Sequence, residues 1–286
     1  MTGHLSVPIE DPEQTAMIPE GKYADIGDGL QVHYHEAGEG EPVVFVHGSG
    51  PGASGYSNFK GCMEAFAARG YRAIAPDTIG YGYSSREPDI DYGFDLFVDG
   101  LKRFLDTLGI EKCSLVGNSM GGAMCIRFAL DNPDRVDKLI MMAPGGMEVR
   151  EVYMGMRGIR RMLKALFGGS ELSLESMKKV FELQIFKPEE VSDDVIAERL
   201  AMAKTQPRKV FERMKVPNLE DEIANLECPI MVFWGQNDQF CPVSGAAKFA
   251  ERCSNTRVLT ITECGHWVMV EHPELFNKTS CDFLDE

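Results

Sequence analysis

Short apolar runs and longer amphipathic segments alternate along most of the 286-residue chain. The runs are almost continuously hydrophobic, which is typical of strands buried on both faces of a sheet. They predict strands at residues 42–46, 72–75, 113–116, 136–142, 229–234 and 257–261. Apolar residues at helical spacing predict helices at 58–68, 95–108, 243–252 and 273–283. This alternation predicts an α/β fold with a mostly parallel sheet flanked by helices.

An alternating pattern before the first buried strand predicts an antiparallel hairpin. Residues 22–26 and 30–36 alternate apolar and polar positions around a Gly-Asp-Gly turn at 27–29. His33 and His35 would share one face of this hairpin. A metal site would need a third ligand, and none is evident, so we expect surface histidines.

The pattern changes between residues 147 and 216, where amphipathic helical segments occur and no buried strand does. Helices are predicted at 153–167, 174–185, 193–204 and 208–214, and such an insertion between two strands is most simply a lid. Methionines recur in the insertion, where they could line an apolar cavity or pack the helices together. The predicted organisation is an N-terminal tail at 1–21, a first part of the core at 22–146, a helical lid at 147–216 and a second part of the core at 217–286.

Composition and charge narrow the classes of function. The formal net charge of −15 argues against nucleic acid and anionic membranes as partners, and an anionic substrate would need a local cation. Eight scattered cysteines without CxxC pairs or metal-ligand spacing indicate reduced core cysteines, as in the cytoplasm. A secretory signal and an apolar run long enough to cross a membrane are both missing from the pattern, so we expect a cytoplasmic protein.

A Gly-x-Ser-x-Gly sequence at residues 117–121 stands between a predicted strand and a helical pattern. This is the layout of a nucleophile elbow, in which Ser119 projects from a sharp turn at the start of a helix. Gly117 and Gly121 suit it because a Cβ atom at either position would collide with the neighbouring strand or helix. The sequence therefore predicts Ser119 as a nucleophile.

A serine nucleophile needs a histidine base and a carboxylate that orients the base. Asp238 and His266 each follow a predicted strand, and active groups of such sheets gather beyond the strands' carboxyl ends. Asp77 comes too early in the chain for the usual order Ser, Asp, His, and His272 precedes a helix and indicates a capping or surface residue. We therefore predict the triad Ser119, Asp238 and His266.

The glycine-rich loop at 48–52 follows a strand at the position where an oxyanion hole receives its second donor. We assign the hole to the backbone N–H groups of Ser49 and Met120, and we expect His47 to support the loop. No Gly-Lys-Ser or Gly-Lys-Thr follows these glycines, so they do not form a phosphate-binding loop.

Four short sequences together resemble the meta-cleavage product hydrolases of the α/β-hydrolase superfamily. They are HGSGPGA at 47–53, SN at 57–58, GNSMGG at 117–122 and GHW at 265–267, and the resemblance runs from about residue 22 to the end. It implies hydrolysis of a C–C bond in a 2-hydroxy-6-oxo-hexa-2,4-dienoate during bacterial aromatic degradation. The products would be a 2-hydroxypenta-2,4-dienoate and a carboxylic acid, with keto–enol tautomerisation before cleavage.

The resemblance also implies substrate contacts at Gly50, Asn58, Asn118, Arg199 and Trp267, with the arginine binding the substrate carboxylate. For Arg199 a surface salt bridge with a nearby acidic residue of its own helix is the alternative. No metal or organic cofactor is implied. The family also implies a homo-oligomer, a dimer or larger.

Several questions stay open at this stage. The triad alone would serve a carboxylesterase equally well, and a slow small-molecule receptor is a further alternative. The substituent at the 6-oxo carbon would lie against Met147, Met154 and Ile159, and its size is not determined. Four basic residues of the first lid helix form a solvated face or attract an anionic substrate: Arg157, Arg160, Arg161 and Lys164.

Overall fold

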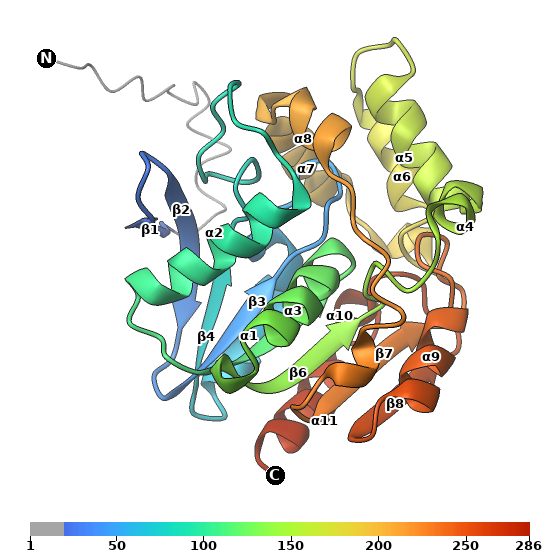
Figure 1. Ribbon diagram of the computed structural model, residues 1–286. Helices are drawn as coiled ribbons and strands as arrows, with labels where there is room; N and C mark the ends of the chain where they lie inside the picture. Colours follow the sequence, from blue (N-terminus) through green and yellow to red (C-terminus); the bar gives the residue numbers. More distant parts are fainter. Residues whose placement is uncertain (1–19) are drawn as a thin grey trace, which may run out of the picture.

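The computed structural model describes residues 20–286, so nearly all of the predicted tail at 1–21 lies outside the described residues. Eight strands form one sheet in the order β1-β2-β4-β3-β5-β6-β7-β8, shown in Figure 1. The strands are β1 (Lys22–Asp25), β2 (Gln31–Ala37), β3 (Glu41–Val46), β4 (Tyr71–Pro76), β5 (Cys113–Asn118), β6 (Val136–Met142), β7 (Ile230–Gly235) and β8 (Thr256–Ile261). Pairings of β2 with β1 and β4 are antiparallel, and all others are parallel. The predicted hairpin and mostly parallel sheet are confirmed.

Burial follows the position of each strand in the sheet. Every residue of β5 and β7, which lie inside the sheet, is buried. The prediction of burial on both faces is wrong for β8, in which no residue is buried, because β8 is the last strand of the sheet. Its outer edge has no neighbouring strand to cover it.

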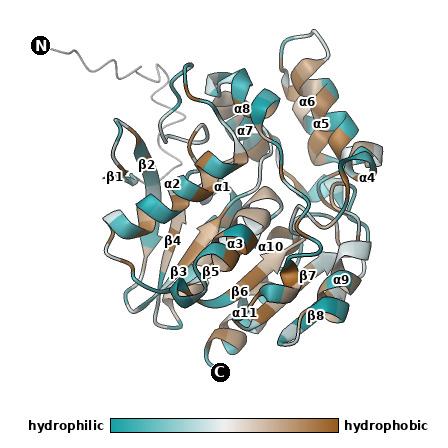
Figure 2. Ribbon diagram, in the orientation of Figure 1, coloured by the Kyte–Doolittle hydropathy of each residue, from teal (hydrophilic) through white to brown (hydrophobic). Residues whose placement is uncertain are grey.

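Helices cover both faces of the sheet. They are α1 (Gly55–Ala67), α2 (Phe94–Thr107), α3 (Met120–Asp131), α9 (Ser244–Arg252), α10 (Val268–Glu271) and α11 (Pro273–Leu284). One apolar cluster packs α2, α3 and α9 onto the sheet, and another packs α1, α10 and α11 onto it. Figure 2 shows the hydrophobic residues concentrated in the central strands, with hydrophilic residues along the outer side of α2. Helix α1 begins earlier than predicted because Ser54 and Ser57 form a capping box at its start.

The segment between β6 and β7 is helical, and Figure 1 shows its helices gathered at one end of the sheet. They are α4 (Arg150–Gly155), α5 (Arg157–Phe167), α6 (Leu174–Phe181), α7 (Asp193–Thr205) and α8 (Arg208–Arg213). The single helix predicted at 153–167 is wrong, because the extended backbone of Met156 (φ −67°, ψ 135°) separates α4 from α5. The boundaries of the lid at residues 147 and 216 stay a prediction.

Two observations bear on the environment of the protein. Within residues 20–286, no helix is both long enough and apolar enough to cross a membrane. All eight cysteines are free and buried.

Candidate active site

Ser119 forms the turn between β5 and α3 by itself, since the strand ends one residue before it and the helix begins one residue after it. Its backbone has φ 55° and ψ −119°, a conformation rarely adopted by a residue with a side chain. The amide of Ser119 donates to the Met142 carbonyl at 3.1 Å. A Cβ atom on Gly121 would lie 2.0 Å from the Val46 carbonyl oxygen, so only glycine lets α3 approach β3 this closely. The turn therefore has the strained geometry of a nucleophile elbow.

Asp238 and His266 form a buried hydrogen-bonded pair beyond the ends of β7 and β8. The distance between His266 Nδ1 and Asp238 Oδ2 is 2.7 Å. The other carboxylate oxygen accepts from the backbone amides of Phe240 and Cys241 at 2.7 and 3.0 Å. Because a carboxylate only accepts hydrogen bonds, Nδ1 of the histidine carries a proton, and in the neutral ring Nε2 is the atom that can accept one. The histidine is thus oriented as a base.

Ser119 and His266 line one cavity of about 490 Å³, part of it open to solvent, which we name the Ser119 cavity. Among the described residues, the Ser119 hydroxyl makes no hydrogen bond to His266. The Ser119 hydroxyl lies instead beside the thiol of Cys241. Burial raises the pKa of this thiol well above its usual value, and the interaction with the Ser119 hydroxyl partly offsets that rise. A hydroxyl and a base that share a cavity commonly align only when substrate is bound.

The glycine-rich loop lies directly against Ser119. A Cβ atom on Gly48 would be 3.2 Å from the Ser119 Cβ atom. The amides of Ser49 and Met120 donate to no other described residue, so both are available to a ligand. His47 holds the loop in place, with Nδ1 2.8 Å from the Gly48 carbonyl oxygen and Nε2 accepting from Thr78 at 2.9 Å. Burial lowers the pKa of His47, and this favours the neutral ring that these two hydrogen bonds require. The predicted supporting role of His47 is confirmed.

Arg199 on α7 is buried, with a relative exposure of 2%. One of its terminal nitrogens donates to Asn58 Oδ1 at 2.7 Å, and the guanidinium lies 5.0 Å from the ring centre of Trp267. Its Nε atom is buried and has no partner among the described residues. Burial lowers its pKa to about 10, so the side chain still carries its charge at neutral pH. The alternative of a surface salt bridge is therefore wrong, and it is Lys60 that pairs with Glu198, at 3.5 Å.

Five further residues of the predicted site line the Ser119 cavity: Gly50, Asn58, Asn118, Arg199 and Trp267. These are the five residues for which the resemblance implies substrate contacts, and five different parts of the chain bring them together.

One buried polar residue that contacts the glycine-rich loop was not predicted. Gln206 is buried and accepts from the Gly52 amide at 2.7 Å, so it ties the glycine-rich loop to the end of α7. A Cβ atom on Gly52 would lie 1.9 Å from the Arg199 carbonyl oxygen. No local pattern in the sequence indicates the contact between Gln206 and Gly52, because the two residues are 154 positions apart.

The other end of the cavity is apolar. It is lined by Ile159, Met162, Val180 and Phe240, three of which form a small hydrophobic cluster of their own. Phe240 stacks on the His266 ring at 5.2 Å between ring centres. Of the three residues predicted to lie against the substrate's substituent, Ile159 lines the cavity and the two methionines do not. Met147 is buried in the main core and Met154 is 40% exposed.

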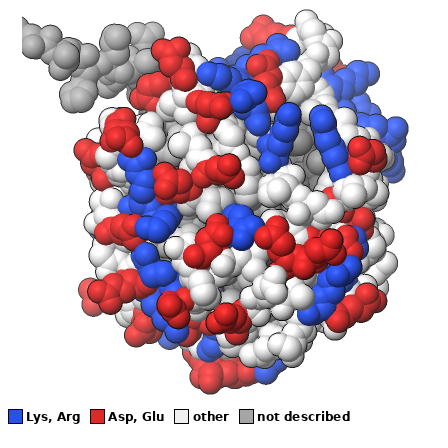
Figure 3. Space-filling view, viewed as in Figure 1, with Lys and Arg blue, Asp and Glu red and all other residues white. Residues whose placement is uncertain are grey.

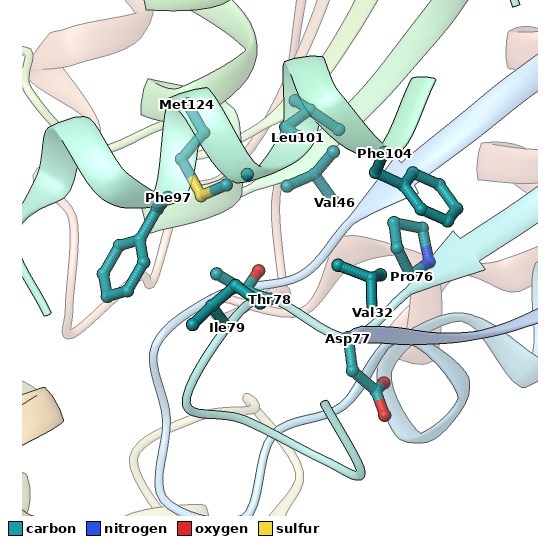
Figure 4. A pocket seen from close by; sticks show the side chains of 11 residues that line it. Val32, Val46, Pro76, Asp77, Thr78, Ile79, Phe97, Leu101, Phe104 and Met124 are labelled. Atoms are coloured by element: carbon teal, nitrogen blue, oxygen red, sulfur yellow. The ribbon is translucent and has the colours of Figure 1, made fainter. Parts of the chain in front are cut away.

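The prediction of surface histidines in the hairpin is wrong, because His33 and His35 are both buried. β2 lies between β1 and β4, and the aromatic rings of Tyr23 and Tyr56 cover the two imidazoles. His33 Nδ1 lies 2.8 Å from the Asp77 carboxylate. A cavity of about 290 Å³ lies nearby, and Figure 4 shows Asp77 pointing away from its apolar lining. Within residues 20–286, no group of three or more His, Cys, Asp or Glu residues is placed to hold a metal ion.

Comparisons with known proteins agree with this geometry. Residues 41–273 match the alpha/beta hydrolase fold family. The chain is 33% identical over 264 residues to a 2-hydroxy-6-oxo-6-phenylhexa-2,4-dienoate hydrolase of Burkholderia cepacia, covering 89% of this chain and 91% of the relative. It is 35% identical over 278 residues to a 2-hydroxy-6-oxononadienedioate/2-hydroxy-6-oxononatrienedioate hydrolase of Paraburkholderia phymatum, covering 93% and 96%. Among solved structures, a meta-cleavage product hydrolase from Pseudomonas fluorescens superposes with a TM-score of 0.80 at 28% identity, covering 93% and 97%.

Proposed function

Because the chain belongs to the α/β-hydrolase family, and within it to the meta-cleavage product hydrolases, we propose that it hydrolyses a C–C bond of a 2-hydroxy-6-oxo-hexa-2,4-dienoate. The observation that carries the proposal is the buried Arg199, which lines the cavity of Ser119 and His266 and forms no ion pair with any described residue. A neutral ester gives no reason to bury a cation there. A substrate carboxylate does, because a buried charge is unfavourable until an opposite charge pairs with it.

In this proposal Arg199 binds the carboxylate of the dienoate. A guanidinium can hold a carboxylate through two parallel hydrogen bonds, which also fixes the substrate's orientation. Asn58 is already bonded to the guanidinium, and Trp267 supports its flat face. The carboxylate end of the substrate therefore lies beside α7, and the chain of the dienoate runs from there toward Ser119.

The reaction itself uses His266 twice. It first moves the proton of the 2-hydroxyl group to the carbon chain, which converts the dienol to the keto form. The nucleophile, Ser119 or a water molecule held beside it, then gives its proton to His266 and adds to the 6-oxo carbon, and the amides of Ser49 and Met120 stabilise the oxyanion. The C–C bond breaks as its electron pair enters the dienolate, and water supplies the hydroxyl group of the released acid. Rotation of the Ser119 side chain from Cys241 toward His266 prepares the attack.

The apolar end of the cavity favours a hydrocarbon substituent on the 6-oxo carbon. His266 lies between the two ends, since Phe240 stacks on its ring and the adjacent Trp267 contacts Arg199. Arg199 is the only lysine or arginine among the described residues that line the cavity. A second carboxylate at the far end would be buried without a partner. We therefore place alkyl- and aryl-substituted dienoates ahead of the dicarboxylic nonadienedioate.

The test is spectrophotometric, because dienoates of this type are yellow and hydrolysis removes the colour. Purified protein is mixed with dienoates that carry methyl, isopropyl, phenyl or 2-carboxyethyl groups at the 6-position. We expect bleaching of the first three with kcat/KM at least about tenfold above that of the 2-carboxyethyl compound. Absence of any bleaching, together with rapid turnover of p-nitrophenyl esters, would establish a carboxylesterase instead.

Two further properties belong to the same proposal. The eight free, buried cysteines are consistent with a reducing compartment, so we place the enzyme in the cytoplasm. By resemblance to its family, we also propose a homo-oligomer, which sedimentation of the purified protein would measure.

A further inference from the structure

Helix α5 carries four cations that have no acidic partner. Arg157, Arg160, Arg161 and Lys164 form no ion pair with any described residue. Residues 152–170 contain these four basic side chains and no Asp or Glu at all. In a chain of net charge −15, such a local excess of positive charge is unexpected.

Most other cations of the same helical segment are neutralised by nearby carboxylates. Lys178 pairs with Asp193 at 2.9 Å, and Arg213 pairs with Asp91 at 2.7 Å. Lys204 and Arg208 also have acidic partners. Figure 3 shows blue side chains gathered at the upper right of the molecule, where Figure 1 places α5. The four α5 cations therefore form a distinct positive surface, which we name the α5 patch.

The same helix forms a wall of the Ser119 cavity. Ile159 and Met162 line the cavity, and at 3.6 residues per turn they lie on the face of α5 opposite the patch. The Gly158 amide donates to the Gln239 carbonyl at 2.8 Å, so α5 is held against the loop that carries Asp238. A helix with its side chains is about 10–12 Å across, which puts the patch roughly 10 Å from the cavity lining. This is about one Debye length at 0.1 M ionic strength, close enough for the charges to act on a ligand at the cavity.

We propose that the α5 patch attracts the anionic substrate to the Ser119 cavity against the negative charge of the rest of the chain. The inference rests on the proposed function, since a dienoate carries the carboxylate on which the patch acts. The patch concentrates substrate near the cavity, and the buried Arg199 then binds its carboxylate. Exposed charges are screened by salt, whereas a buried pair is screened much less, so ionic strength separates the two contributions.

The experiment compares kcat/KM at ionic strengths from 0.01 to 0.5 M for the wild type and two variants of the full chain. The patch variant replaces Arg157, Arg160, Arg161 and Lys164 by Gln, a good helix former. The control variant makes the same change of charge at Lys102, Lys112, Arg257 and Lys278, none of which lies in the helical segment between β6 and β7. Each variant is assayed with the 6-phenyl dienoate, with anionic p-nitrophenyl hemisuccinate and with neutral p-nitrophenyl acetate.

For the dienoate at 0.01 M, we expect the patch variant to lose about fivefold to tenfold in kcat/KM, and at 0.5 M less than about twofold. The hemisuccinate should follow the dienoate, while the acetate ester and the control variant should stay near wild type. An equal loss in the control variant would overturn the proposal, because the overall net charge would then be responsible. The proposal would also be overturned if kcat/KM of the patch variant depended on ionic strength as strongly as that of the wild type. If no dienoate is hydrolysed, the proposed function fails, and the two esters alone decide whether the patch attracts anions.

Discussion

Replacing Arg199 by Met separates the binding of the substrate carboxylate from the rest of catalysis. Methionine is unbranched like the aliphatic part of arginine, can lie against Trp267 and removes the buried charge. The substrate carboxylate would then enter an apolar site without a partner. Removing one member of a buried ion pair typically costs about 3–5 kcal/mol, so kcat/KM for the 6-phenyl dienoate should fall about 10²- to 10⁴-fold. Hydrolysis of p-nitrophenyl acetate, which has no carboxylate, should stay within about threefold of wild type.

The same substitution should leave the free energy of unfolding almost unchanged. Burial lowers the pKa of Arg199 from 12.5 to about 10, which corresponds to about 3 kcal/mol disfavouring the charged side chain at neutral pH. Methionine removes that penalty. Two effects of the substitution are destabilising: the contact with Trp267 is lost, and the Asn58 oxygen loses its hydrogen bond, each costing about 1–3 kcal/mol. The opposing contributions nearly cancel, and urea unfolding at pH 7 measures the difference.

Arg208 provides a matched control for Arg199. It also lies on the helical segment and stacks on an aromatic ring, 4.9 Å from the centre of Phe167, but its side chain is 65% exposed. Arg208→Met should leave both activities unchanged. Arg199→Lys keeps the charge but loses the second hydrogen bond, and it should lose about tenfold for the dienoate. An equal loss of ester and dienoate turnover in Arg199→Met, with the fold intact, would refute the carboxylate role.

Three further predictions follow from neighbouring residues. Gly52→Ala should destabilise the protein by about 1–3 kcal/mol, because φ at this position is +71° and the added Cβ atom would overlap the backbone of α7. Gly50→Ala is the control: no atom lies within 4 Å of the added Cβ atom, so this variant should unfold at the same urea concentration as wild type. Burial lowers the pKa of His47 in the folded protein, so as the pH falls His47 takes up a proton in the unfolded chain before it does so in the folded protein. The free energy of unfolding should therefore decrease from about pH 6.5 downward. His47→Gln should therefore lose less stability between pH 7 and pH 5 than wild type, as urea unfolding at the two pH values would show; an equal loss would contradict this. Asp238→Asn should lower kcat about 10⁴-fold for esters and dienoates alike, since His266 would take the wrong tautomer, and retention of either activity would count against the pair.

The sequence by itself was sufficient for the order of the strands and for the position of the elbow. Strands such as β5 and β7 are continuously apolar because both faces are covered, and that pattern is local. The turn at Ser119 could also be predicted, because the glycines on either side of it are required by contacts with the adjacent strand and helix. The pairing of Asp238 with His266 could be predicted because each residue follows a strand, and the carboxyl ends of parallel strands meet at one edge of the sheet.

The tertiary structure alone decided which polar residues are buried and what the cavity contains. Arg199 is buried because it contacts Asn58, 141 positions away in the sequence, and Trp267 beside β8, and no local pattern encodes such contacts. A weak signal was its spacing three residues after Ile196, the other buried residue of α7. His33 is buried for the same kind of reason, since its cover comes from Tyr23 and Asp77 on other elements. Local periodicity records whether a face is apolar, but burial of a charged or polar group depends on the partners that distant segments bring to it.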